Sequence, residues 1–126
     1  MSVTDSRPVY LNLLKIRQPV TAVLSIFHRL SGILMVLLLP GLVYLLNLSL
    51  SNPAGFAQVA GLLGSVPAKV AAVLICWAFA HHLLAGLRFL ILDFDVGVER
   101  KVARQTAWLI HVAAALVALF SLWVMF

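Results

Sequence analysis

Residues 70–87 read VAAVLICWAFAHHLLAGL, an uncharged apolar run between Lys69 and Arg88. A run of about 18 such residues is long enough to cross the hydrocarbon core of a bilayer as a helix. Two histidines, His81 and His82, stand near its end. Polar groups inside a hydrophobic segment are costly, so these histidines mark a candidate functional site.

The composition indicates that the whole chain is a membrane protein. Of its 126 residues, 63% are hydrophobic and 10% are charged, and the mean hydropathy is +1.10. Soluble domains of this size do not normally reach such values. The net charge of +5 provides no continuous basic face for nucleic acid, because the charges stand between apolar runs. We therefore expect a bilayer and not a nucleic acid as the surroundings of this chain.

Apolar runs and turn signals divide the chain into three spanning helices. The expected spans are residues 21–50, 67–92 and 104–126. Pro19 suits the start of the first helix, with Thr21 as a candidate cap. The turn cluster SLSNPAG, residues 49–55, ends this span, and the short apolar segment 54–64 is expected at the membrane interface. The polar stretch 93–103 is expected to be a loop between the second and third spans.

Basic residues predict the orientation of this all-α domain, residues 1–126. One side of the predicted membrane holds Arg7, Lys15, Arg17, Arg29, Arg88, Arg100, Lys101 and Arg104. The other side holds only Lys69. By the positive-inside rule, the N-terminus and the loop 93–103 face the cytoplasm or a mitochondrial matrix, and the C-terminus faces outside. The first residues lack the short apolar core and cleavage site of a signal peptide, so none is expected.

Small residues surround His82 on its predicted helix. Ala78, His82 and Gly86 recur every four residues, which gives one small face that a helix or a planar cofactor can approach closely. His82 lies about 9 Å along the helix from Arg88, inside the membrane. It is either a hydrogen-bonded core histidine or an axial ligand of a haem iron. Gly86 leaves room for a porphyrin, and His81 points about 100° away, so we favour His82 as the ligand.

A second polar cluster lies at the start of the first span, in the sequence SIFHRLSG of residues 25–32. Ser25 and Arg29 are four residues apart and share a helical face, with His28 beside them. A hydroxyl and a guanidinium can donate hydrogen bonds to a quinone carbonyl, and Arg29 or His28 can pair with a haem propionate. The alternative is an arginine that snorkels to the interface beside a capping serine.

Taken together, these motifs resemble a known family. Its pattern is carried by Arg7-Pro8, Pro19, the block Ser25–Gly32, and His82-x-x-x-Gly86-x-Arg88 followed by Asp93. The sequence closely resembles the large cytochrome b membrane-anchor subunits of succinate dehydrogenase, respiratory complex II. The resemblance covers essentially the whole chain. It implies half of a two-subunit anchor bundle, in the bacterial inner membrane rather than the mitochondrial one.

The resemblance also implies a cofactor, a substrate and partners. One haem b is expected between this chain and a second small anchor subunit, which supplies the other axial ligand. A quinone, expected to be ubiquinone, is reduced near the cytoplasmic surface with electrons from the iron-sulfur subunit, and the flavoprotein subunit oxidises succinate. This chain is the non-flavin membrane subunit and is catalytic only within the complex.

Family roles can be assigned to matching positions of this sequence. His82 corresponds to the haem iron ligand of this subunit. Ser25 and Arg29 correspond to the quinone-binding serine and arginine, while His28 and Arg29 fall where propionate contacts are expected. Phe89 departs from the family, since many relatives have a histidine there.

Several alternatives stay open from the sequence. Asp93 matches a family acid, but it either pairs with Arg88 or ends the helix. His111 lies about 10 Å beyond Arg104, nearly as deep as His82, which makes an intrachain pair of haem ligands conceivable. A haem-free structural anchor, a fumarate reductase anchor and a small transporter subunit are the other functional alternatives. The role of His81 is not assigned.

Overall fold

The computed structural model describes residues 16–126, which form four helices and no strand. These helices are α1 (Val20–Ser51), α2 (Pro53–Leu63), α3 (Val66–Leu92) and α4 (Arg100–Met125). Helices α1, α3 and α4 are each long and apolar enough to cross a membrane. This confirms the expected all-α class with three candidate spanning helices. Arg7, Pro8 and Lys15, which support the orientation and the family pattern, lie outside the described residues.

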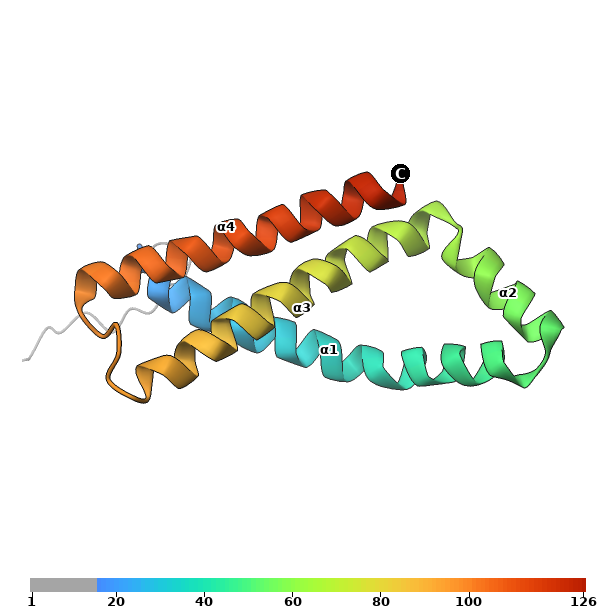
Figure 1. The fold of residues 1–126 in the computed structure, drawn as a ribbon, viewed down its shortest axis with the longest axis horizontal. Helices are drawn as coiled ribbons and strands as arrows, with labels where there is room; N and C mark the ends of the chain where they lie inside the picture. Colours follow the sequence, from blue (N-terminus) through green and yellow to red (C-terminus); the bar gives the residue numbers. More distant parts are fainter. Residues whose placement is uncertain (1–15) are drawn as a thin grey trace, which may run out of the picture.

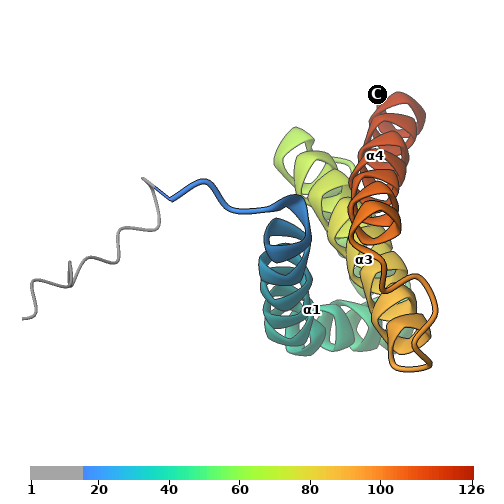
Figure 2. The same cartoon turned by 90° about the vertical axis from the view of Figure 1, so that its left-hand side faces the viewer.

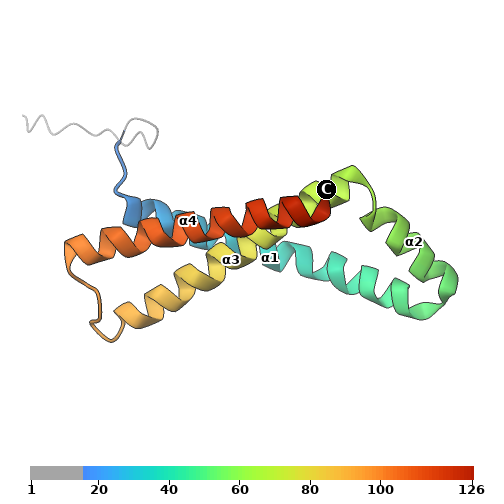
Figure 3. The same cartoon turned by 45° about the horizontal axis from the view of Figure 1, so that its top comes forward.

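The three long helices form an antiparallel bundle in which α3 contacts both α1 and α4 (Figure 1). One end of the bundle contains the start of α1, the end of α3 and the start of α4, and we call it the basic end. Seen from the basic end, α3 passes between the other two helices (Figure 2). Helices α1 and α3 diverge toward the opposite end, where α2 joins them (Figure 3). The bundle therefore brings residues of α1, α3 and α4 together in its basic half.

Local sequence signals explain where the helices begin. Helix α1 starts at Val20 with Pro19 as its N-cap residue, so Thr21 lies inside the first turn and does not cap it. Asn52 caps α2 by accepting a hydrogen bond of 2.8 Å from the backbone N–H of Gly55. A Cβ atom at Gly55 would collide with the carbonyl of Leu48 in α1. Glycine at this position therefore permits the close turn from α1 into α2.

Two features of the long helices differ in detail from the sequence pattern. Helix α1 continues through Pro40 and changes direction along its length (Figure 1), because proline removes one backbone hydrogen bond inside a helix. Helix α4 begins at Arg100, so the loop before it is shorter than the expected residues 93–103. This loop turns sharply at Asp95 and Gly97, whose φ angles are 60° and 77°. Glycine adopts a positive φ without steric cost.

The packed core of the chain is small and consists mainly of alanine. Leu24, Ala78, Ala85, Ala107 and Ala114 have no exposed surface. Most large apolar side chains of α1 point outward, and no residue of its most apolar window is buried. Exposed apolar surface on this scale needs lipid or another protein to cover it. The fold therefore presents α1 as the helix most available to the bilayer or to a partner.

Candidate functional site

His82 of α3 is held against the backbone of α1. Its Nδ1 atom lies 3.0 Å from the carbonyl oxygen of His28 and 3.3 Å from Oγ of Ser31. A carbonyl oxygen can only accept, so the neutral ring carries its proton on Nδ1 and donates it to His28. The Nε2 atom then keeps a free lone pair. This is the arrangement of a metal-binding histidine, whose other nitrogen is fixed by a backbone carbonyl.

Gly32 makes the contact between His82 and α1 possible. A Cβ atom at Gly32 would lie 2.8 Å from Cε1 and 3.2 Å from Nδ1 of His82, closer than van der Waals contact permits. Gly86, which is predicted to leave room for a porphyrin, is less restrictive toward the histidines. In the structure, a Cβ atom at Gly86 would lie 3.4 Å from Nε2 of His28, which is ordinary contact. Gly32 is thus the more restrictive of the two glycines.

His28 forms a second layer over His82. The two rings stack with centroids 4.2 Å apart and planes inclined by 13°. The ring of Phe89 meets His28 edge-on, with centroids 5.2 Å apart. Phe89 therefore packs on the cluster at the position where many relatives have a histidine.

An apolar groove opens beside these histidines on the outer side of α1 and α3. Its volume is about 560 Å³, and it is lined by His28, Arg29, Gly32, Ile33, Val36, Leu37 and His82. Polar side chains gather at one end, and the remaining wall is aliphatic. Arg29 is exposed at the polar end. A groove with two imidazoles, one guanidinium and a long apolar wall has the chemistry that a haem requires.

Ser25 and Arg29 lie on the same side of α1, one helical turn apart. Ser25 is half-buried and Arg29 is exposed. Arg29 lines the groove together with His82, whereas Ser25 is not among its lining residues and lies one turn closer to the basic end. The structure thus brings Arg29, His28 and His82 together and places Ser25 at the margin of the cluster.

His81 faces the opposite partner helix, α4. Its side chain is fully buried, and its Nε2 atom lies 3.3 Å from Nδ1 of His111. One of these nitrogens carries a proton and the other a lone pair, so the two rings are joined by a direct hydrogen bond. His111 consequently contacts His81 and not His82. The intrachain pairing of His82 with His111 around one iron is not formed in this structure.

Arg88 also binds α4. It is only 8% exposed, and it donates hydrogen bonds to Oγ1 of Thr106 at 3.0 Å and to the carbonyl of Ala103 at 3.1 Å. Asp93 is the C-cap residue of α3, as one of the two sequence alternatives proposed. The contact between Arg88 and Thr106 joins two different helices, so spacing within one helix did not predict it.

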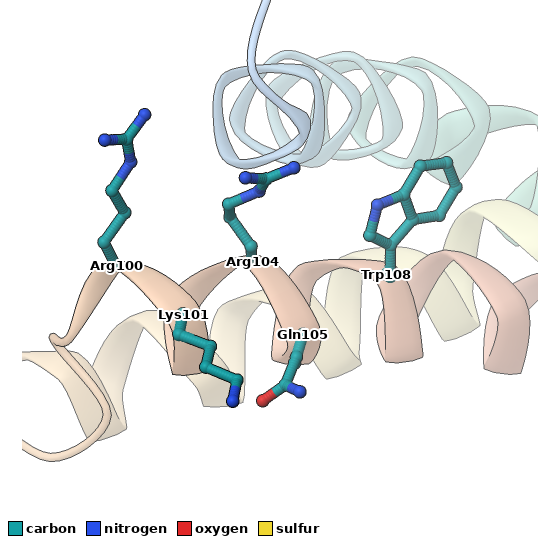
Figure 4. Close-up of a pocket in the computed structure, with 5 residues that line it drawn as sticks. All are labelled: Arg100, Lys101, Arg104, Gln105 and Trp108. Atoms are coloured by element: carbon teal, nitrogen blue, oxygen red, sulfur yellow. The ribbon is translucent and has the colours of Figure 1, made fainter.

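The start of α4 adds positive charge to the basic end. A surface hollow of about 610 Å³ is lined by Arg100, Lys101, Arg104, Gln105 and Trp108. Arg104 and Trp108 point toward α1, while Lys101 and Gln105 point to the other side of the helix (Figure 4). The basic end therefore offers cations on more than one face of α4.

These features define a class of protein. The chain is a helical membrane protein with a largely exposed apolar face, and the imidazoles of His28 and His82 line a groove on that face. Comparison with known proteins identifies the family. A model of the succinate dehydrogenase/fumarate reductase transmembrane subunit matches residues 3–122, and the chain belongs to this family.

Curated relatives show the same similarity along the whole chain. The succinate dehydrogenase cytochrome b556 subunit of Coxiella burnetii is 32% identical over 122 residues, covering 94% of this chain and 96% of that protein. The subunit of the same name from Paracoccus denitrificans is 28% identical, with 96% and 93% covered. The one from Rickettsia prowazekii is 27% identical, with 97% and 94% covered. The expected membership is therefore confirmed.

Proposed function

We propose that this chain is the cytochrome b anchor of a succinate:quinone oxidoreductase, which binds one haem b together with a second anchor subunit and forms part of the quinone-reduction site. The observation that carries the proposal is the state of His82. Its Nδ1 atom is fixed by the carbonyl of His28, and its Nε2 atom is free. Family membership and the similarity to cytochrome b556 subunits support the choice of haem as the group that His82 binds.

The residues around the groove suit this cofactor. His82 supplies one axial nitrogen, and Gly32 keeps the space that its ring needs. His28 and Arg29 stand at the polar end, where they pair with the propionates. When bound, haem b supplies a one-electron carrier beside the quinone. His28, the other imidazole in the groove, stacks face to face on His82 and is assigned to the propionates, so the second axial ligand comes from the partner subunit.

Quinone binding is assigned to Ser25 and Arg29. The Ser25 hydroxyl and the Arg29 guanidinium donate hydrogen bonds to one quinone carbonyl. The positive charge of Arg29 stabilises the negative charge that develops on this oxygen as electrons arrive. Ser25 lies on the side of the groove that faces the basic end. Water there can deliver the two protons that reduction of a quinone to a quinol consumes. Ubiquinone is the expected substrate.

Partner subunits cover the surfaces that this chain leaves open. The second anchor subunit packs against the exposed face of α1, since a haem shared between subunits needs both at the groove. The iron-sulfur subunit docks at the basic end, on the cations around Arg104, and the flavoprotein subunit lies beyond it. The basic end faces the cytoplasm under the positive-inside rule. The relatives named above are bacterial, which favours the bacterial inner membrane.

A reduced-minus-oxidised absorption spectrum of the purified complex tests the proposal. We expect one low-spin haem b per complex in the wild type, loss of that haem in His82→Ala, and its retention in the matched control His111→Ala. Loss in His111→Ala with retention in His82→Ala would reverse the assignment. An assembled wild-type complex without haem would identify a haem-free structural anchor instead. Direction of electron flow, which separates a succinate dehydrogenase from a fumarate reductase, is measured by comparing the two activities.

A further inference from the structure

We propose that the contacts of α3 with α4 position the haem ligand His82, although no residue among them touches the groove. The contacts are the bond between His81 and His111 and the bonds from Arg88 to Thr106 and the Ala103 carbonyl, and we call them the α3–α4 clamp. His81 and Arg88 are positioning residues in this account. The inference rests on the proposed function, since it concerns the residue assigned to haem binding.

The buried part of the α3–α4 interface consists mainly of small residues, and Ile110 of α4 is the larger side chain within it. Ala78 and Ala85 of α3 and Ala107 and Ala114 of α4 are fully buried. Methyl groups let two helices approach closely but give little relief to oppose rotation or sliding. Inside a bilayer the hydrophobic effect does not favour one packing over another, because lipid tails are as apolar as the helices. Directional hydrogen bonds therefore select the rotation of α3.

Two separated bonds fix both the rotation and the register of α3. His81 and Arg88 are seven residues apart, which is about 10 Å along the helix and nearly two full turns. Both therefore lie on the face toward α4, and both are at most 8% exposed. His82, the next residue after His81, points about 100° away, toward α1. Fixing His81 on α4 thus fixes the direction in which His82 leaves α3.

The required precision shows why this matters. The Cα atoms of a helix lie about 2.3 Å from its axis and the imidazole reaches to about 6 Å, so a rotation of about 10° moves Nε2 by about 1 Å. Metal–ligand distances tolerate only about 0.2 Å. The ring is held on α1 through Nδ1, and the backbone of α3 is held on α4 by the clamp. Removing either restraint lets Nε2 shift, which weakens its bond to iron and speeds haem release.

The clamp also explains two buried polar atoms. Among the described residues, Nδ1 of His81 and Nε2 of His111 are buried without a hydrogen-bond partner. Burying such atoms without a hydrogen-bond partner costs free energy. A leucine pair at both positions would avoid that cost. For stability alone, two leucines would be better than the two histidines. Leucines, however, could not form the directional hydrogen bond between α3 and α4.

The test uses the purified complex and variants that separate positioning from stability. The double variant His81→Leu/His111→Leu removes both polar partners, so no orphaned histidine remains and the bundle is expected to assemble. We expect it to retain haem, but with a shifted low-spin electron paramagnetic resonance signal and haem release about tenfold faster, as for loss of an outer-shell partner. The control Ser121→Ala removes an α4 hydroxyl that bonds only Val117 of its own helix, and it should match the wild type.

Rescue distinguishes this role from simple packing. His111→Asn places an amide atom where Nδ1 of His111 lies, and it should restore both the signal and the release rate, whereas His111→Leu should not. A double leucine variant with an unchanged signal and release rate would overturn the inference, and so would failure of that variant to assemble. Absence of haem from the wild-type complex would instead refute the proposed function itself.

Discussion

Gly32→Ala is the substitution whose effect the structure defines most sharply. The added methyl group would lie 2.8 Å from Cε1 and 3.2 Å from Nδ1 of His82. Ordinary contact begins near 3.4 Å, so the ring must move by several tenths of an ångström. His82 cannot move freely, because its Nδ1 atom is bonded to the carbonyl of His28. The substitution therefore displaces the imidazole or breaks this hydrogen bond.

Two opposing terms set the effect of Gly32→Ala on stability. Alanine is better than glycine inside a helix by about 1 kcal/mol, while overpacking costs about 1–3 kcal/mol. The net destabilisation is thus about 0–2 kcal/mol, and the complex should still assemble. Haem binding should fall much more, because a displacement of several tenths of an ångström exceeds the tolerance of about 0.2 Å for a metal–ligand distance.

The assay measures haem per complex and the rate of haem release, with Gly41→Ala as the matched control. A Cβ atom at Gly41, on the same helix, meets nothing within 4 Å, so this variant should keep full haem. Gly86→Ala should lie between them, since its Cβ atom would only touch His28 at 3.4 Å. Wild-type haem content and release in Gly32→Ala would refute the claim that His82 binds iron from its position against α1.

Two further predictions concern other parts of the site. Arg29→Ala should lower the rate of quinone reduction at least about tenfold, because it removes a charged donor to the developing oxyanion. Succinate oxidation with a soluble artificial acceptor should stay unchanged. Wild-type quinone activity in the variant would count against the assignment of Arg29. Thr106→Val keeps the side-chain shape but removes the acceptor of Nε in Arg88, at a cost of about 1–3 kcal/mol. The melting temperature of the complex should therefore fall, and an unchanged value would show that this bond contributes nothing.

The spanning helices were predictable from the sequence because their signal is local. Long uncharged runs such as residues 70–87 need only a bilayer to define them. The different directions of His81 and His82 were also predictable, since adjacent residues of a helix point about 100° apart. In the structure His81 faces α4 and His82 faces α1, as this periodicity requires.

Contacts between helices were not predictable in the same way. The role of Gly86 in leaving room for a porphyrin stays a prediction, whereas the close contact of Gly32 with the His82 ring was not predicted from the sequence. The bond between His81 and His111 joins residues 30 positions apart, and the register of α3 on α4 decides which histidine His111 meets. Hydropathy and spacing within one helix carry no information on that register.

The start of α4 illustrates a smaller difference. The charges of Arg100, Lys101 and Arg104 suggested that the third span begins at residue 104. The helix itself begins at Arg100, because basic residues are compatible with a helix outside the hydrocarbon layer. The start of a helix and the start of its membrane-spanning part can therefore differ. The pattern of charged and apolar residues predicts the membrane-spanning part.

The central claim is that Nε2 of His82 binds the haem iron, and a cavity-rescue experiment tests it most directly. His82→Gly removes the imidazole and leaves its space beside Gly32, so the assembled complex should lose the low-spin haem signal. Added free imidazole should then restore the signal by occupying that space. A low-spin signal that persists in His82→Gly without imidazole would contradict the account.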